Sequence, residues 1–380
     1  MQLLKGFEVE MYTGRPDGEV VGLADRITRD LPGFVREPDR RNVEYVTPPL
    51  ASYSALVCEL LRPRQILRRY LAGLGDLTLL PGSTLALGGS DHFERSDPSN
   101  PYHSFIERTY GTRVVTTSIH INVGLPLELL FPALRLVRAE ASLYLALSAS
   151  SPFLDGRLTG SHSHRWQVFP ETPDPVPIFR DHAHYCTWVE AQLRSGQMQN
   201  ERHLWTSVRP NGPRRPYDLN RLELRISDLV ANPLVTLAMT ALLETRLHSL
   251  ADDPTAWDPL AVWSGEELLV LCRENERRVA RDSLAARVIH WQTGAEIAVS
   301  EWLEQQVATA WRIAQPLGWS SFLAPLQQVL QEGNEAMRWL RQVQSGQSIA
   351  EVYAQAIQEM ALQELELCRC LCRDRDLQLL

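Results

Sequence analysis

The stretch KGFEVEMY, residues 5–12, decides how the chain is interpreted, because its polar and apolar residues alternate. Alternate side chains of an extended strand share a face, so Glu8 and Glu10 point one way while Phe7, Val9 and Met11 point the other. A strand with one apolar and one polar face is typical of an antiparallel sheet that packs on one side only. The segment therefore predicts such a strand with two carboxylates on its open face.

Three further segments show the same alternation, and their polar faces carry acidic, imidazole or guanidinium side chains: residues 42–47 with Glu44, 114–123 with His120, and 221–227 with Glu223 and Arg225. A solvated sheet face explains any one of these strands alone. Placed side by side, however, the carboxylates would repel each other unless cations lay among them. Clustered carboxylates with one imidazole suit Mg²⁺ or Mn²⁺. Arg225 lies two residues beyond Glu223 on the same face, and a metal carboxylate beside a phosphate-binding arginine suits phosphoryl transfer.

Composition excludes several classes of function. The chain has 380 residues, 44% hydrophobic and 22% charged, with a formal net charge of −8, which fits a soluble globular protein and not a nucleic-acid-binding one. No signal peptide and no apolar stretch of membrane-spanning length is visible. Lys5 is the only lysine, so a Walker A loop is excluded, and a Schiff-base site elsewhere in the chain is too. Six cysteines do not make a disulfide scaffold, and we expect a cytoplasmic protein.

The order of elements predicts an α+β fold. Strands are expected at 5–12, 42–47, 83–88, 114–123 and 221–227, and helices at 51–73, 127–148, 181–195, 234–250 and 265–285. Helical periodicity alone continues through 298–315, 320–343 and 348–373. We therefore expect a catalytic α+β domain over 1–295 and a helical C-terminal region over 296–380 packed on it. The proline-rich segments 170–177 and 209–216 are interpreted as long loops.

An ordered series of short motifs resembles the cyanobacterial-type glutamate–cysteine ligases and, more broadly, the carboxylate–amine ligases of the glutamine-synthetase-like superfamily. The motifs are GFEVE (6–10), REPDRRNVEYVTPP (36–49), SIHIN (118–122), SPF (151–153), GSHSHRW (160–166), LELR (222–225) and EN (274–275). The resemblance implies an antiparallel sheet curved into an active-site funnel that binds ATP with two or three Mg²⁺ ions. It covers roughly residues 6–285 and assigns no site residue after about 290.

The resemblance also implies the roles of individual residues. The metal ligands would be Glu8, Glu10, Glu37, Glu44, His120 and Glu223. Arg225 would face the phosphates, and Arg165 would hold a carboxylate or a phosphate. Asn275 and Arg281, together with Arg277, would reach the mouth of the site and contact the nucleotide.

The implied reaction joins the γ-carboxylate of L-glutamate to the amine of L-cysteine, with ATP as co-substrate and Mg²⁺ (or Mn²⁺) as cofactor. A ligase with another amine acceptor would keep the same metal and phosphate residues. A catalytically silent ATP- or metal-binding regulator and a structural cation-binding protein are two alternatives of another class. The complete set of carboxylates with His120 and Arg225 argues against the silent regulator, and Arg225 beside Glu223 argues against the structural protein.

Other motifs carry weaker interpretations. The pairs His162/His164 and His182/His184 raise the alternative of a zinc hydrolase, but the HExxH helix motif is absent. Cys368, Cys370 and Cys372 are interpreted as part of an ordinary helix, with a redox-sensitive thiol pair as the alternative. The arginines of residues 62–69 are interpreted as a solvated helix face. Tyr102, Trp166 and Trp205 are assigned to packing.

Overall fold

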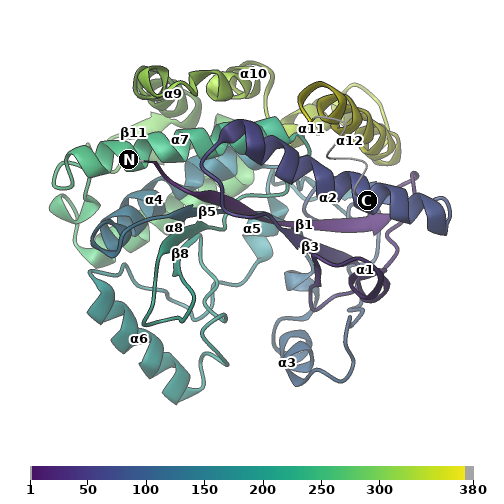
Figure 1. Cartoon of the computed structure of the whole chain (residues 1–380), viewed down its shortest axis with the longest axis horizontal. Coiled ribbons are helices and arrows are strands. Elements are labelled where there is room, and N and C mark those ends of the chain that lie inside the picture. The colour runs from purple at the N-terminus through teal and green to yellow at the C-terminus, as the bar shows by residue number, and fades with distance from the viewer. Residues whose placement is uncertain (1, 373–380) are drawn as a thin grey trace.

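A computed structural model describes residues 2–372, and its centre is an open antiparallel sheet (Figure 1). The strand order is β2-β3-β1-β5-β9-β8, with β4 paired to β1. The strands are β1 (Lys5–Gly14), β2 (Phe34–Arg36), β3 (Asn42–Val46), β4 (Thr78–Leu80), β5 (Ile119–Gly124), β8 (Val208–Asn211) and β9 (Arg221–Leu224). Two small hairpins stand apart from it: β6 (Phe153–Leu154) with β7 (Arg157–Leu158), and β10 (Arg287–Ile289) with β11 (Glu296–Ala298).

Helices cover one side of the sheet and leave the other side largely open. In Figure 1 α2, α7 and α9 to α12 lie above the sheet, while α3 and α6 lie below it, far from each other. The covering helices are α2 (Tyr53–Leu74), α4 (Leu127–Ser148), α7 (Pro233–Asp252), α8 (Gly265–Asp282), α9 (Val299–Leu317), α10 (Ala324–Glu332), α11 (Glu335–Gln344) and α12 (Ile349–Leu371). Shorter helices are α1 (Ala24–Asp30), α3 (Pro101–Tyr110), α5 (His164–Val168) and α6 (His182–Ser195).

The alternation in β1 sorts its side chains as the sequence predicts. Phe7, Val9 and Met11 are at most 1% exposed and belong to the main hydrophobic core, whereas Glu8 and Glu10 point to the opposite face. Burial of three large apolar side chains on one face fixes the register of the strand, because a one-residue slip would exchange the two faces. The predicted α+β class with an antiparallel sheet is confirmed.

Two local predictions are wrong, and one element was not predicted. Residues 83–88 form a buried loop, in which Ser83 Oγ accepts from the Leu229 amide and Thr84 Oγ1 donates to the Phe153 carbonyl. The segment taken as a loop from Arg209 begins inside β8, where Pro210 is tolerated because β8 is an edge strand. The short β10–β11 hairpin was not expected.

The C-terminal helices share the core with the rest of the chain. The main hydrophobic cluster contains Phe7 of β1 and also Leu303, Val307 and Leu326 of α9 and α10. Because the core is shared, it does not mark a boundary, and the division at 295/296 remains a prediction. Residues 373–380 lie outside the described part of the chain.

Helix α12 is held against α2 by buried charges, which corrects the interpretation of Arg64 and Arg68 as part of a solvated face, whereas Arg69 is exposed as that interpretation expects. Arg64 is completely buried and donates to Glu364 of α12, to the Tyr45 hydroxyl and to the Ala231 carbonyl. Arg68 donates to the other oxygen of Glu364 at 2.6 Å. Removing Glu364 would leave Arg64 buried without its counter-charge, which is strongly destabilising.

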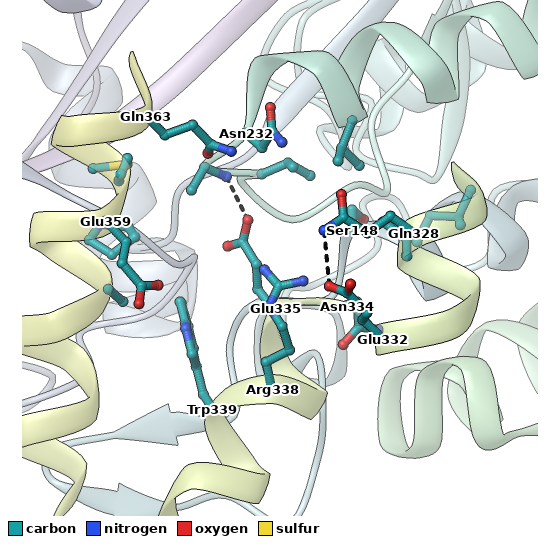
Figure 2. Close-up of a pocket in the computed structure, with 18 of the residues that line it drawn as sticks. Ser148, Asn232, Gln328, Glu332, Asn334, Glu335, Arg338, Trp339, Glu359 and Gln363 are labelled. Carbon is teal, nitrogen blue, oxygen red and sulfur yellow. Dashed lines mark hydrogen bonds between the residues drawn. The ribbon is translucent and has the colours of Figure 1, made fainter. Parts of the chain in front are cut away.

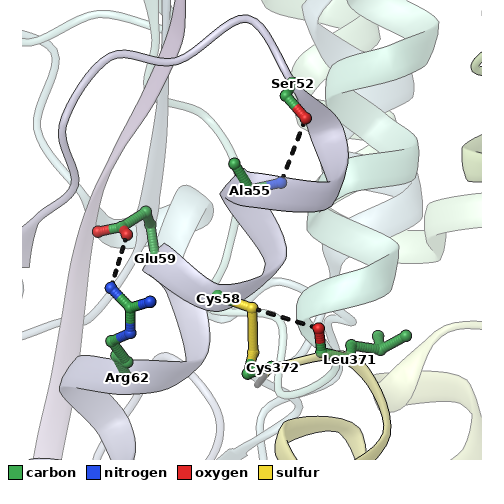
Figure 3. Close-up of a disulfide and its surroundings, with 7 residues drawn as sticks. All are labelled: Ser52, Ala55, Cys58, Glu59, Arg62, Leu371 and Cys372. Carbon is green, nitrogen blue, oxygen red and sulfur yellow. Dashed lines mark hydrogen bonds and ion pairs between the residues drawn. A yellow bond between two sulfur atoms is a disulfide. The ribbon is translucent and has the colours of Figure 1, made fainter. Parts of the chain in front are cut away.

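A disulfide joins the same two helices. Cys58 of α2 is bonded to Cys372, the residue that ends α12 (Figure 3). It closes a loop with a sequence separation of 314 residues. Cys368 and Cys370 are free thiols, one buried and one exposed. The interpretation of the Cys368–Cys372 run as an ordinary helix therefore holds for two of the three cysteines.

Among residues 2–372, no helix is both long enough and apolar enough to cross a membrane.

Candidate active site

Strand register places the predicted polar residues opposite one another on the open face. In the β1–β5 pair Glu8 lies opposite His120, and in the β1–β3 pair Glu10 lies opposite Glu44. In the β5–β9 pair Glu223 lies opposite Asn122. Directly opposed residues have Cβ atoms about 5 Å apart, so four strands contribute to one continuous polar surface.

The six predicted metal ligands form two groups. In the His120 group, ligand atoms of Glu8, His120 and Glu223 all lie within 4.8 Å of one another. His120 Nδ1 is 3.1 Å from Glu8 Oε2 and 3.7 Å from Glu223 Oε1. In the Glu44 group, Glu10, Glu37 and Glu44 meet the same criterion. His120 Nε2 is 3.8 Å from Glu10, so the two groups adjoin.

Protein cations already compensate the His120 group. Arg209 binds both oxygens of Glu223, at 2.8 and 2.9 Å, and Arg225 Nη1 donates to Oε1 at 2.5 Å. Asn211 adds a hydrogen bond of 2.6 Å. Burial raises the pKa of Glu223, but the charges of Arg209, Arg225 and His120 outweigh it and hold the pKa well below its usual value. Glu223 is thus a carboxylate fixed in its charged form.

Nearby cations compensate the Glu44 group less well, because His120 and Arg165 lower the pKa of Glu10 and Arg225 lowers that of Glu37, but burial outweighs them. Burial, followed by the charges of Glu37, Glu8 and Glu10, raises the pKa of Glu44 well above its ordinary value. Burial likewise raises the pKa of Glu10 and of Glu37. Three carboxylates that are converging and partly buried are costly when ionised, and a divalent cation relieves that cost directly. Oxygen-only donors of this kind fit Mg²⁺ or Mn²⁺.

Two cavities with shared wall residues lie at this site, and the smaller one is lined by members of both groups. A small one, of about 70 Å³, is lined by Glu10, Glu37, His120, Arg165 and Arg225 among others. A larger one, of about 560 Å³, shares Phe169 and Trp205 with it, and its other walls include Trp166, Glu171, Arg273, Glu276 and Arg277. The larger cavity has the size of a small-molecule binding site.

Comparison with known proteins identifies the family. The family model described as glutamate–cysteine ligase family 2 matches residues 4–358, nearly the whole chain. The chain belongs to this family.

Individual relatives agree with this family assignment. A Gloeobacter violaceus protein that bears the provisional name glutamate–cysteine ligase 2 is 28% identical over 268 residues, covering 67% of each chain. A Rubrobacter xylanophilus protein, provisionally named glutamate–cysteine ligase 2-1, is 26% identical over 341 residues, covering 87% of this chain and 86% of its own. The chain is thus a member of a ligase family, and its enzymatic class is that of a ligase.

A solved structure supports the fold. The glutamate–cysteine ligase of Francisella tularensis in complex with AMP superposes with a TM-score of 0.74, over 98% of this chain and 92% of that chain. Sequence identity over this match is 13%, so the likeness is one of fold.

Arg165 lies beside the two groups. It is 2% exposed, and its guanidinium donates to the carbonyls of Ile226 (2.9 Å) and Arg225 (3.1 Å). Its Nε is buried and has no hydrogen-bond partner among the described residues. Burial lowers the pKa of Arg165, although Asp228 lies 3.8 Å away. Arg165 therefore ties the strand that carries Arg225 to α5 and presents positive charge to the small cavity.

The structure does not bring Asn275 and Arg281 to the metal groups. Both ends of the Asn275 amide are used by the backbone of Ile289, at 2.9 Å each, which anchors β10 to α8. Arg281 is exposed, and its Nε and Nη2 both donate to Oδ2 of Asp282. The structure therefore shows no contact between these two residues and the metal groups, and their nucleotide-binding role remains a prediction. Arg277 lines the larger cavity but pairs with Glu274.

Several site residues were not expected. Arg209 and Asn211 contact Glu223 from β8, and the sequence signal was present, because both lie on the same strand face two residues apart. Because the segment 209–216 contains proline and glycine, it was interpreted as a loop. Trp166 and Trp205, assigned to packing, line the larger cavity, and Tyr102 packs edge-on against His203.

The histidine pairs have other roles. His162 Nδ1 lies 2.6 Å from the Ser283 hydroxyl, and His182 Nε2 lies 2.9 Å from the Pro216 carbonyl. Neither pair joins a group of converging ligands among residues 2–372. Nothing in this geometry favours a zinc hydrolase.

Proposed function

We propose that the protein catalyses ATP-dependent formation of a γ-glutamyl amide bond from L-glutamate and L-cysteine, the first step of glutathione biosynthesis. The observation that carries the proposal is the meeting of two divalent-metal groups with Arg225 on one sheet face. Activating a carboxylate with ATP brings two anions together, so a site for this reaction needs concentrated positive charge. We expect a cytoplasmic location, since the reaction consumes ATP.

The donor sets fit Mg²⁺ as the cofactor. Glu8, His120 and Glu223 would hold one ion, and Glu10, Glu37 and Glu44 another. Bound metal would neutralise the charge of the ATP phosphates during transfer. The raised pKa of Glu44 is the feature of the metal-free site that such a charge would correct.

Arg225 is proposed to face the transferring phosphoryl group. Its guanidinium is held by Glu223 at 2.5 Å, it is within 3.4 Å of His120 Nδ1, and it lines the small cavity. Burial opposes the charge of Arg225, but Glu223 and then Glu8 raise its pKa, so the cation persists. Transfer of the γ-phosphoryl group of ATP to the glutamate γ-carboxylate gives a γ-glutamyl phosphate and releases ADP. Attack by the cysteine amine then displaces phosphate, the nitrogen loses a proton, and the amide remains.

The larger cavity is proposed to take the amino acid substrates. Its wall combines the indoles of Trp166 and Trp205 with the cations Arg273 and Arg277 and the buried acid Glu276. Such a wall can bind α-carboxylates and α-amines at the same time. Glu276 accepts from Trp166 Nε1 through Oε2, and its Oε1 has no partner among the described residues.

The test is ADP release with Mg²⁺ and glutamate across a panel of amino acids, with the products analysed by mass. Cysteine-dependent ADP release with a γ-linked dipeptide is the expected result. A strong preference for another amine would replace cysteine as acceptor while keeping the ligase chemistry. No amine-dependent ADP release at all, with ATP still bound, would favour a silent nucleotide-binding regulator.

A further inference from the structure

A further cavity lies on the far side of the sheet from the candidate active site, between the C-terminal helices (Figure 2). Its volume is about 460 Å³. Its walls come from α10, α11 and α12 together with the segment before α7. None of the residues assigned above to metal, phosphate or amino acid binding lines it.

The lining is unusually acidic. Four carboxylates face one cation, Arg338, so the formal charge of the wall is 1 − 4 = −3; the acids are Glu332, Glu335, Glu359 and Glu366. Arg338 donates to the Gly333 carbonyl at 3.0 Å, and no ion pair between it and these acids is present within residues 2–372. Between them lie apolar side chains, including Leu147, Val230 and Met360, with Trp339 at one end.

Glu335 is the decisive group. It is 8% exposed, and one of its oxygens accepts from the Ala231 amide at 2.9 Å. The other oxygen, Oε2, is buried and has no hydrogen-bond partner among the described residues. In Figure 2 its carboxylate stands amid the labelled side chains, with Asn232 and Gln363 above it and Arg338 and Trp339 below.

An unpaired buried carboxylate oxygen is costly, and a donor supplied from outside removes that cost. Burial raises the pKa of Glu335, although Arg338 and the Ala231 amide oppose it. The neighbouring acids favour a cation as that donor, and the apolar wall favours a short aliphatic body. The indole of Trp339 can add a cation–π contact.

We propose that this cavity is a second binding site that takes a small aliphatic cation of the diamine class, with one ammonium group bound to Glu335. The second ammonium group is then free to meet the exposed carboxylates on α12, such as Glu359. The site is independent of the proposed ligase activity, because no residue is shared between the two.

The experiment is calorimetric titration of the full chain at about 0.15 M salt with putrescine and, separately, with 1,4-butanediol, its uncharged analogue of similar length. Both titrations are repeated with excess Mg²⁺, which occupies the acidic metal groups. Saturable binding of putrescine that survives Mg²⁺, without binding of butanediol, is expected. Absence of putrescine binding, equal binding of butanediol, or loss of binding in Mg²⁺ would overturn the proposal; the last result would place the diamine in the metal groups instead.

Variants locate the site. Glu335→Gln keeps an oxygen for the Ala231 amide and should weaken putrescine binding by about 10- to 100-fold, the range for a hydrogen bond between charged groups. Glu359→Gln, exposed on α12, should weaken it by a few fold, and it tests the proposal even if Glu335→Gln fails to fold. Glu301→Gln, exposed on α9 outside the cavity, is the matched control and should bind as the unaltered chain does. Unchanged affinity in both cavity variants would rule the site out.

Discussion

The two halves of the candidate active site contain almost the same chemical groups and are stabilised in opposite ways. In the His120 group the carboxylate of Glu223 is surrounded by Arg209, Arg225 and Asn211, and its pKa is held down. In the Glu44 group the carboxylates face each other, and their pKa values are raised.

The difference indicates that the His120 group is preorganised, whereas the Glu44 group needs a bound cation to relieve its repulsion. Where the protein supplies its own cations, the geometry is fixed before any metal binds. Where it does not, the acids repel each other and destabilise the folded state, and binding of a cation relieves part of this destabilisation. We propose that binding and release of a metal nucleotide uses both arrangements, the first to position the nucleotide and the second to attract the metal.

The largest expected effect comes from removing the cation that belongs to the preorganised half. Arg225→Ala should reduce turnover by about 10³-fold, since loss of one arginine at a phosphoryl-transfer site has effects of this size. Arg221→Ala is the matched control on the same strand face; it contacts Asn122 and Asn220, and its turnover should change by less than about tenfold. Steady-state kinetics on variants with unchanged circular dichroism make the measurement, and substantial activity in Arg225→Ala contradicts a phosphate role.

The second effect is on stability. Glu223→Gln leaves Arg209 and Arg225 buried beside a neutral amide and should lower the free energy of unfolding by about 3 kcal/mol. It should also raise the Mg²⁺ concentration needed for activity. Urea unfolding without metal and a Mg²⁺ titration of the rate are the two measurements. An unchanged Mg²⁺ dependence would remove Glu223 from the ligand set and leave it as an arginine-positioning residue.

The third effect is on the pH dependence of stability, and it concerns His203, a residue outside both groups. His203 is completely buried, and burial lowers its pKa to about 4, against an ordinary value of 6.5. A lowered imidazole pKa means that the unfolded chain binds the proton more tightly, so stability is full above pH 6.5 and falls as the pH drops toward 4. We expect a loss of about 2 kcal/mol over this window, after an allowance for solvent screening.

The variant His203→Gln isolates this contribution. Its stability should fall less steeply between pH 6.5 and 4 than that of the unaltered chain, as measured by chemical unfolding at each pH. Parallel curves for the two proteins would show that His203 does not titrate with a lowered pKa.

The smallest effect has the opposite sign to that of Glu223→Gln. Glu44→Gln removes one of the mutually repelling carboxylates and should raise the free energy of unfolding of the metal-free protein by about 1 kcal/mol. The gain should vanish in excess Mg²⁺, where the unaltered chain is stabilised by the ion. Thermal unfolding with and without Mg²⁺ distinguishes the states, and destabilisation in both would mean that Glu44 is not under electrostatic strain.

The sequence predicts well what strand periodicity controls. Alternation put Glu8 and Glu10 on the polar face of one strand and Glu223 and Arg225 on the polar face of another. Pairing of neighbouring strands then brought the two sets together. It predicts poorly what depends on contacts between distant segments. The position of Asn275 on a helix does not reveal that β10 will use both ends of its amide.

The same limit applies to the arginines of α2. Their spacing suits an exposed helix face, but Glu364, about 300 residues later, turns Arg64 into a buried ion pair. Arg209 was missed for a different reason: a proline in an edge strand has the composition of a loop.

The disulfide between Cys58 and Cys372 determines which fragments are released when a peptide bond is cleaved. It makes residues 58–372 a covalent ring, inside which lie His120, Arg165, Glu223 and Arg225. A single peptide-bond cut anywhere within the ring releases no fragment until the disulfide is reduced. A cut between β3 and Cys58 would instead break the covalent connection to the segment that carries Glu8, Glu10, Glu37 and Glu44. After such a cut, only hydrogen bonds and packing would hold the Glu44 group in place.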